Sequence, residues 1–358
     1  MSESTPETLG IGVIGLGFMG CTHVRAYQYA AAAGLGCKLI AVADRSVERL
    51  NGRAFVSGNI DTGSSEQLFD PARMRGYLDP RELLTDPRIH AVSICTHTDT
   101  HVDLAIAALR AGKHVLVEKP VATSSADVQR LAAAAKGSGK VCMPAMVMRF
   151  WPEWTWLRDT ARAGTHGRTL SASFQRMGSA PTWTDFYRDT TRSGGALFDL
   201  HIHDTDFIRW CFGEPREVVS TGTIDHLTTL YRFDPAMNAP PHVTAEGAQN
   251  ITPGFGFRMR YTVVFERATA DFDITRTPTL LLCKDGRADP VPLVQSAPLS
   301  AYEIEVRHYL AAIAAASAPE SGPSTVPLIA TIEDAVRTTT LLEAEQRSMT
   351  TGTPQRWA

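Results

Sequence analysis

The sequence lacks the features of a membrane protein and of a nucleic-acid-binding protein. No run of about 18 consecutive apolar residues occurs along the chain, which excludes a membrane-spanning helix. An excess of charge of one sign is also lacking, because 35 Lys and Arg stand against 38 Asp and Glu and the basic residues are dispersed. With a net charge of −3 and dispersed basic residues, the sequence shows no basic patch that would bind DNA or RNA. Neither a membrane nor a nucleic acid is expected as a partner.

Paired cysteines and an apolar leader are absent as well. The six cysteines form no C-x-x-C pair. Four of them stand inside apolar runs, so we interpret them as reduced, buried, small hydrophobic residues. The first residues, MSESTPET, are acidic and contain no apolar signal region, which predicts a cytoplasmic protein. The length of 358 residues suggests two domains with sizeable cores.

What the sequence does contain is a glycine-rich segment at residues 9–20, LGIGVIGLGFMG. It holds two overlapping G-x-G-x-x-G matches, and only the second lies between an apolar run and a predicted helix, as a dinucleotide fingerprint requires. In this register Gly15 makes a tight turn, Gly17 lets the backbone approach a pyrophosphate and Gly20 lets helix and strand pack closely. The N–H groups that begin the helix then face the phosphates. The cofactor-binding residues predicted in this turn are Gly15, Gly17, Phe18, Met19 and Gly20.

A second apolar run, residues 38–43, ends in Asp44, as expected of a buried parallel strand. Asp44 lies near the distance of about 20 residues beyond the fingerprint at which an acid accepts a hydrogen bond from the ribose 2′-hydroxyl. Because Asp44 would repel a 2′-phosphate, NAD is the expected cofactor. Arg45 and Arg49 follow closely and are able to tolerate that phosphate, which leaves NADP open. The turn-rich segment at about residues 51–76 is interpreted as an inserted surface loop.

Strands and helices alternate over residues 1–148. This alternation predicts an α/β domain with a doubly wound parallel sheet, a Rossmann domain. The predicted strands are residues 91–96, 114–118 and 141–147, with helices at residues 101–111 and 124–137. Ligands bind such sheets beyond the carboxyl ends of the strands. The further cofactor-binding residues predicted near these ends are Thr96, His101, Glu118 and Lys119.

Over residues 149–358 the pattern changes to successive strands without helices between them, which implies a mainly antiparallel sheet in a second, α+β domain. The strand patterns are residues 168–177, 217–224, 243–252, 256–266 and 269–282. Two helical patterns follow at residues 301–316 and 332–349. The sequence does not decide which domain these two helices pack against.

One helical segment among these strands, residues 194–210, concentrates polar side chains. On a regular helix Asp199, His203, Asp206 and Trp210 fall within one stripe, since residues three and four apart are neighbours. Histidine is the side chain whose unperturbed pKa lies close to neutral, which suits it to proton transfer. The segment therefore aims an imidazole and two acids in one direction.

Two other interpretations of this segment stay open. His201, His203 and Asp204 form a metal-ligand pattern, but side chains two apart on a helix point away from each other, and no metal is expected. The other alternative is a surface helix whose polar residues are simply solvated.

Together these features resemble the Gfo/Idh/MocA family of oxidoreductases, named for glucose–fructose oxidoreductase and inositol dehydrogenase. The resemblance covers nearly the whole chain. It rests on the glycine fingerprint with Asp44, the block from residue 92 to Glu-Lys-Pro at residues 118–120, and Gly-Gly-x-x-x-Asp-x-x-x-His at residues 194–203. It implies a Rossmann domain followed by an open-faced antiparallel sheet domain that binds substrate and assembles a homo-oligomer, either a dimer or a tetramer. His97, where many members have proline, and His201, where many have glycine, depart from the pattern and suggest a subgroup with its own substrate.

Carried over by position, Lys119 matches the family's catalytic lysine, Asp199 its substrate-orienting acid and His203 its proton-transfer residue. The implied reaction is hydride transfer between a secondary hydroxyl carbon of a sugar, sugar derivative or cyclitol and the nicotinamide of NAD. The resemblance implies that His203 removes the hydroxyl proton, that Lys119 stabilises the charge on that oxygen, and that Asp199 holds a neighbouring hydroxyl. The residues predicted to contact substrate, with core packing as an equally good account, are Arg149, Trp151, Trp183 and Tyr187.

Two alternative functions remain on the same scaffold. An NAD-dependent glycosidase would oxidise its sugar transiently, eliminate the aglycone and restore its own cofactor. A non-catalytic NAD-binding regulator is disfavoured because Lys119, Asp199 and His203 are all present.

Overall fold

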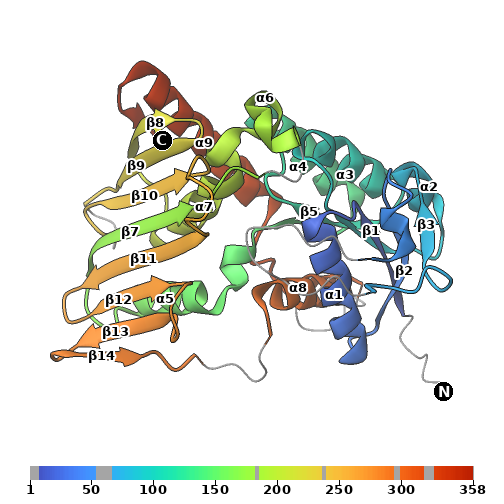
Figure 1. The fold of residues 1–358 in the computed structure, drawn as a ribbon, viewed down its shortest axis with the longest axis horizontal. Helices are drawn as coiled ribbons and strands as arrows, with labels where there is room; N and C mark the ends of the chain where they lie inside the picture. The colour runs from blue at the N-terminus through green and yellow to red at the C-terminus, as the bar shows by residue number, and fades with distance from the viewer. Residues whose placement is uncertain are drawn as a thin grey trace. The chain divides into compact units, whose positions relative to one another are not determined.

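The computed structural model describes residues 8–53, 67–181, 185–235, 239–293, 299–317 and 326–357. Residues 54–66 of the predicted loop at residues 51–76, and the predicted substrate residue Trp183, therefore lie outside the described residues. The chain divides into two compact units (Figure 1). Unit 1 comprises Met1–Ala122, Ala126–Val147 and Leu299–Val336, and unit 2 comprises Thr123–Ser125, Met148–Pro298 and Arg337–Ala358.

Unit 1 is built on a six-stranded parallel sheet with the order β3-β2-β1-β4-β5-β6. The strands are β1 (Leu9–Ile14), β2 (Cys37–Ala43), β3 (Arg75–Tyr77), β4 (Ala91–Ile94), β5 (His114–Glu118) and β6 (Cys142–Ala145). The order reverses between β1 and β4, the switch point at which doubly wound sheets bind their ligands. The central strands β1, β4 and β5 are buried almost throughout, as parallel strands covered on both faces must be. The predicted Rossmann domain is confirmed.

The helices of unit 1 begin where the local sequence supplies caps. Asp79 accepts a hydrogen bond from the Arg81 amide at 2.8 Å and Pro80 opens the short helix that follows. Ser300 and Glu303 form a reciprocal capping box that begins the long C-terminal helix of this unit. These helices are α1 (Phe18–Ala32), α2 (Pro80–Thr85), α3 (His101–Arg110), α4 (Ser125–Ser138) and α8 (Ala301–Ala316), with the short turns η1 (Arg49–Asn51) and η2 (Thr98–Thr100).

Helix α8 differs from the predicted domain assignment. The domain boundary expected from the sequence, after residue 148, placed all later residues in the second domain. In the structure Leu299–Val336 belongs with unit 1. Helix α8 packs against α1 through buried side chains that include Val306, Tyr309 and Ile313. The periodicity of the sequence marks this helix correctly but carries no information about which partner its apolar face covers.

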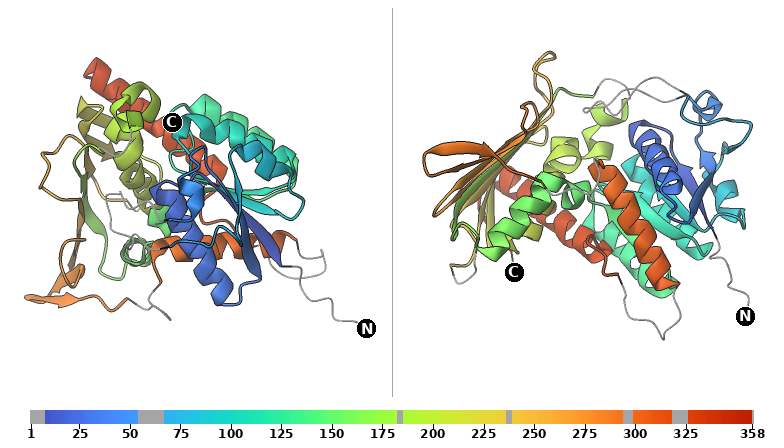
Figure 2. Two further views of the ribbon diagram at one scale, coloured as in Figure 1. Left: turned by 45° about the vertical axis from the view of Figure 1, so that its right-hand side comes forward. Right: turned by 90° about the horizontal axis from the view of Figure 1, so that it is seen from below.

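Unit 2 is built on a nine-stranded sheet with the order β14-β13-β12-β11-β7-β10-β9-β8-β15. Its neighbours are antiparallel except for β7 and β10, so the mainly antiparallel sheet is confirmed. The strands are β7 (Thr169–Met177), β8 (Glu217–Thr223), β9 (His226–Arg232), β10 (Val243–Ala248), β11 (Arg258–Phe265), β12 (Thr269–Asp273), β13 (Leu280–Lys284), β14 (Arg287–Pro290) and β15 (Gln355–Arg356). Figure 2 shows the helices of this unit on one face of the sheet.

The core of unit 2 lies between that face and the helices. Trp154 on α5 meets Tyr261 and Phe272 of the sheet edge-on, with ring centroids 4.9 and 4.5 Å away, and Phe207 of α7 at 6.1 Å. One indole thus joins α5, α7 and two strands. The helices are α5 (Pro152–Ala163), α6 (Thr190–Ser193), α7 (Ile202–Phe212) and α9 (Ile332–Thr351), with η3 (Val147–Phe150), η4 (Asp185–Arg188) and η5 (Leu197–His201). The first residues of α9, up to Val336, and the first residue of η3 belong to unit 1. Among the residues that the structure describes, no helix combines the length and apolar composition needed to cross a membrane.

Candidate functional site

The glycine turn of unit 1 has the shape that a dinucleotide requires. Gly15 follows β1 with a φ of 88°, and a Cβ there would lie 2.5 Å from the carbonyl oxygen of Cys95. A Cβ on Gly20 would lie 1.8 Å from the carbonyl oxygen of Gly15, so helix α1 packs directly on the turn. At Gly17, by contrast, no heavy atom beyond its chain neighbours lies within 4 Å of such a Cβ, which leaves space against the backbone. Two glycines close the turn and the third keeps it accessible, so the turn fits a pyrophosphate at the start of α1.

Asp44 follows β2 and is tied to the same turn. Its carboxylate accepts hydrogen bonds from the Leu16 amide at 2.7 Å and the Ser46 amide at 2.9 Å, and Arg49 pairs with it at 3.4 Å. A carboxylate has about four acceptor positions, so capacity is left for a ribose hydroxyl. The contact between Asp44 and ribose stays a prediction. Because Arg49 is engaged with Asp44 and Arg45 is exposed, the local charge favours NAD.

His101 connects the ends of β4 and β5. Its ring is buried, with Nδ1 2.9 Å from the carbonyl oxygen of Pro120 and Nε2 3.0 Å from that of Thr96. Burial lowers the pKa of His101, and the two carbonyl contacts oppose that shift. A neutral ring donates to one of these carbonyls at a time. In this structure His101 therefore holds the two turns together, and its predicted contact with the cofactor stays untested.

A buried chain of hydrogen bonds ends at Glu118 and Lys119. Tyr27 and His23, both on α1, lie 2.8 and 3.1 Å from the hydroxyl oxygen of Ser93 on β4. The other ring nitrogen of His23, Nε2, lies 3.0 Å from Oε1 of Glu118, whose Oε2 accepts the backbone N–H of Lys119 at 3.1 Å. Both carboxylate oxygens of Glu118 are therefore engaged in hydrogen bonds. Through Glu118, the backbone of Lys119 is connected to helix α1. Sequence reasoning missed this chain because Glu118 lies 95 residues from His23.

In unit 2 the predicted regular helix over residues 194–210 is wrong in its first turn. Residues Leu197–His201 form a wider π-helical turn, η5, and α7 begins only at Ile202. Within residues 196–212, all of which are described, only Asp199, His203 and Trp210 are partly exposed. Three of the four residues of the predicted stripe are thus partly exposed. Asp206 is buried.

Two bidentate ion pairs hold α7 in place. Arg176 of β7 donates to both oxygens of Asp204 at 3.1 and 2.9 Å, and Arg149 of η3 donates to both oxygens of Asp206 at 2.8 Å. All four side chains are at most 3% exposed. Thr338 of α9 also donates to Asp206 at 2.9 Å. These pairs hold α7 firmly, because charged groups removed from water are fixed by their partners.

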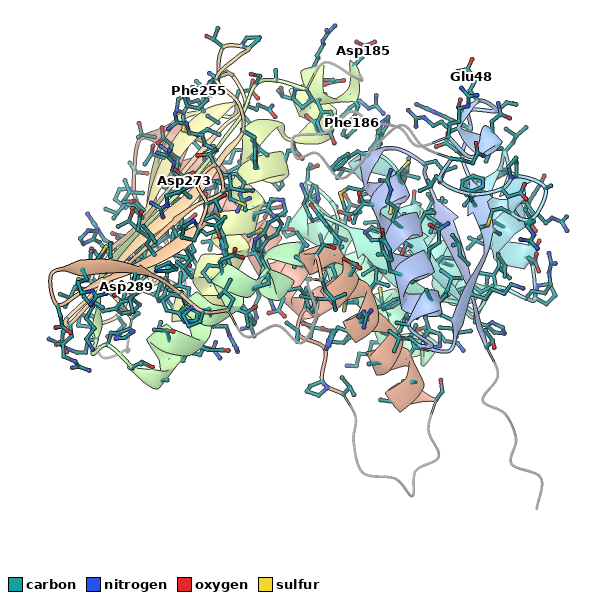
Figure 3. All side chains as sticks on the ribbon, turned by 60° about the horizontal axis from the view of Figure 1, so that its bottom comes forward. Glu48, Asp185, Phe186, Phe255, Asp273 and Asp289 are labelled. Atoms are coloured by element: carbon teal, nitrogen blue, oxygen red, sulfur yellow. The ribbon has the colours of Figure 1, made fainter. Side chains whose placement is uncertain are left out.

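The predicted substrate residues take different places in unit 2. The guanidinium of Arg149 is buried against Asp206. Trp151 is half-buried and meets Trp154 edge-on at 6.4 Å. Tyr187 lies on η4 beside Phe186, whose position is labelled in Figure 3, with their rings 5.5 Å apart. No contact with substrate is tested for any of them.

Comparison with known proteins agrees with this fold. Residues 9–146 match the family model described as the Gfo/Idh/MocA oxidoreductase family with an NAD-binding Rossmann fold, and residues 154–270 match the Gfo/Idh/MocA C-terminal domain. The chain belongs to the Gfo/Idh/MocA family of NAD-binding oxidoreductases. The resemblance inferred from the sequence is confirmed, and the Rossmann domain is NAD-binding.

Particular relatives are dehydrogenases. The chain is 32% identical to myo-inositol 2-dehydrogenase of Thermotoga maritima over 60% of its own length, and this match spans only 58% of that protein. It is 29% identical to scyllo-inositol 2-dehydrogenase (NAD(+)) of Bacillus subtilis, over 83% of this chain and 84% of that one. Among solved structures, levoglucosan dehydrogenase in complex with NADH and levoglucosan has a TM-score of 0.77 at 20% identity, covering 98% of this chain and 99% of that chain. A probable dehydrogenase from Thermotoga maritima has a TM-score of 0.73 at 24% identity, covering 97% and 99%. The structural likenesses show the fold alone.

Proposed function

We propose that the protein is an NAD-dependent dehydrogenase that acts on a secondary hydroxyl of a sugar, sugar derivative or cyclitol. The observation that carries the proposal is the exposure pattern around α7. On a segment that is buried except at Trp210, Asp199 and His203 remain partly accessible, and buried ion pairs fix the helix that carries His203. The names of the inositol dehydrogenase relatives support a polyhydroxylated ring as substrate.

The residues proposed to act are Lys119, Asp199 and His203. Bound NAD supplies the acceptor for the hydride that leaves the substrate carbon. His203 takes the proton of the reacting hydroxyl at its imidazole, which leaves the substrate oxygen as the carbonyl oxygen of the product. The ammonium of Lys119 donates a hydrogen bond to that oxygen and stabilises its developing negative charge. Asp199 accepts a hydrogen bond from a neighbouring hydroxyl, which selects a substrate with adjacent hydroxyls.

Turnover of a defined panel tests the proposal. Purified protein is incubated with NAD and myo-inositol, scyllo-inositol, levoglucosan or simple aldoses, and NADH is followed by its absorbance. We expect NADH to form with at least one cyclitol or sugar. Release of an aglycone from a glycoside without net NADH would instead establish the glycosidase chemistry and overturn the proposal.

Variants then test the roles of the residues. Lys119→Ala and His203→Ala should each lower kcat by roughly 10²–10⁴-fold, because a positioned proton-transfer or charge-stabilising group is lost. The Kd for NAD should stay unchanged in His203→Ala. Lys136→Ala and His242→Ala remove an exposed lysine and an exposed histidine elsewhere and serve as matched controls. Near-normal kcat in either site variant would refute the role of that residue.

We further propose that the protein works in the cytoplasm, in carbohydrate metabolism, as a homo-oligomer assembled through the nine-stranded sheet. The family resemblance supports this assembly, and so does the sheet itself. Along β11, buried Met259, Tyr261 and Val263 alternate with more accessible residues on the opposite face. Light scattering on the purified protein should give the mass of a dimer or tetramer, and a monomer at working concentration would contradict the proposal.

A further inference from the structure

His201 is a buried histidine that the proposed reaction does not use. It is the last residue of the π-helical turn η5, two positions before His203. Its Nε2 lies 2.8 Å from Oε2 of Glu345 on α9, and both side chains are 0% exposed. The imidazole nitrogen and the carboxyl oxygen are thus in direct polar contact away from water.

The carboxyl group of Glu345 is itself held from several elements. Tyr231 of β9 donates to its Oε1 at 2.9 Å, and Thr205 of α7 donates to the same oxygen at 3.2 Å. Thr229 of β9 donates to Oε2 at 3.1 Å. Tyr231 also lies 3.1 Å from Nε2 of His201. Every member of this network is buried, so each hydrogen bond is unscreened by water and costly to break.

Packing fixes the other side of the imidazole ring. A Cβ on Gly247 of β10 would lie 2.8 Å from Cβ of His201 and 3.0 Å from its Nδ1, so the strand accommodates this ring only because residue 247 is glycine. Nδ1 is buried and has no hydrogen-bond partner among the described residues. The ring is therefore held by Nε2 on one side and by the backbone of β10 on the other.

We propose that His201, through Glu345, is a positioning residue that holds η5 in its π-helical form, and thereby sets the direction of Asp199 relative to His203. An α-helix turns about 100° per residue, because it has 3.6 residues per turn. On a regular α-helix Asp199 and His203, four residues apart, would lie about 40° apart around the axis. The wider π-helical turn changes this angle, so conversion of η5 to a regular turn would move the carboxylate of Asp199 relative to the imidazole of His203. This inference rests on the proposed function, in which both side chains act on one substrate.

The test removes the buried pair while it preserves volume. The double variant His201→Leu/Glu345→Met replaces both partners with apolar side chains of similar size, which is often neutral for stability, whereas removal of one partner would leave a buried charge. We expect kcat to fall by about 10- to 100-fold, since a misplacement of about 1 Å costs that order of rate. The Kd for NAD should stay unchanged. The unfolding midpoint is measured beside kcat to show that the variant is folded.

A matched control variant removes an ion pair at the other end of the same helix. Arg209 donates to Glu214 at 2.9 Å near the C-terminal end of α7, far along the helix from η5. The double variant Arg209→Met/Glu214→Met should lower stability and leave kcat within about twofold of the wild type. If it lowers kcat as much as the His201 variant does, the pair at η5 has only a general structural role and the proposal is overturned.

Hydrogen exchange in the protein without ligands separates this inference from the proposed function. Amides of residues 197–203 should exchange at least tenfold faster in His201→Leu/Glu345→Met, and at the wild-type rate in the Arg209 control. If the wild type turns over no substrate while this exchange difference appears, the proposed function fails and the positioning of η5 stands. Unchanged exchange, or wild-type kcat without the pair, would overturn the positioning role.

Discussion

Glu305→Gln should stabilise the protein by an amount that grows with pH. Glu305 lies on α8, on the side packed against α1, and it is 0% exposed. Neither oxygen of its carboxyl group has a hydrogen-bond partner among the described residues. Burial, and next the charge of Glu118, raises the pKa of Glu305 well above its ordinary value of 4.5. The folded protein therefore keeps Glu305 protonated at a pH at which the unfolded chain has lost this proton.

The sign and the size follow from proton linkage. Above pH 4.5 the unfolded state binds fewer protons than the folded state, so the free energy of unfolding falls as pH rises. The slope is about 1.4 kcal/mol per pH unit for one group, and it continues until the folded-state pKa is reached. Glutamine carries no charge at any pH. The difference in the free energy of unfolding between Glu305→Gln and the wild type should therefore widen by this amount for each pH unit. If the buried amide of glutamine itself changes stability, it does so equally at every pH. It then shifts the difference in unfolding free energy by a constant and leaves its slope against pH unchanged.

Urea unfolding at pH 5, 6, 7 and 8 measures this difference. All six tryptophans lie in the segments of unit 2, so fluorescence follows that unit, and far-UV circular dichroism is needed to include unit 1. Glu48→Gln is the control, because Glu48 is exposed (Figure 3) and its removal should give no pH-dependent difference. A difference for Glu305→Gln that stays flat or shrinks with rising pH would refute the reasoning.

The glycine turn and the buried ion pairs give further predictions. Gly20→Ala should destabilise unit 1 in thermal unfolding, because its Cβ would lie 1.8 Å from a backbone oxygen, whereas Gly17→Ala, with no atom within 4 Å, should fold normally and raise the Kd for NAD. Gly137→Ala, in open space within α4, is the control and should change stability by no more than about 1 kcal/mol. Arg149→Met leaves Asp206 buried without its cation and should cost about 3–5 kcal/mol in urea unfolding. Wild-type stability in that variant would contradict the account of how α7 is held.

The local sequence determined the elements of unit 1 and the cofactor turn. The apolar runs that become β1 and β2, the spacing of Gly15, Gly17 and Gly20, and the position of Asp44 are all short-range features. Helix α8 was also marked by periodicity alone, and its bounds at Ala301–Ala316 match the predicted range. Such features are readable because strand burial, tight turns and helical faces depend on residues within about one turn or one strand of each other.

Only the tertiary structure decided how the candidate site residues are supported. The periodicity placed Asp206 beside His203, but Arg149, 57 residues away in sequence, draws Asp206 into the core. Glu345 reaches Tyr231 across 114 residues, and its contact with His201 accompanies a turn that the sequence presented as a regular helix. A buried charge must find a partner wherever the fold brings one, and that partner's position along the chain leaves no local pattern. The sequence therefore determined which side chains are available for chemistry, and packing between distant segments decided which of them stay accessible and in which direction they point.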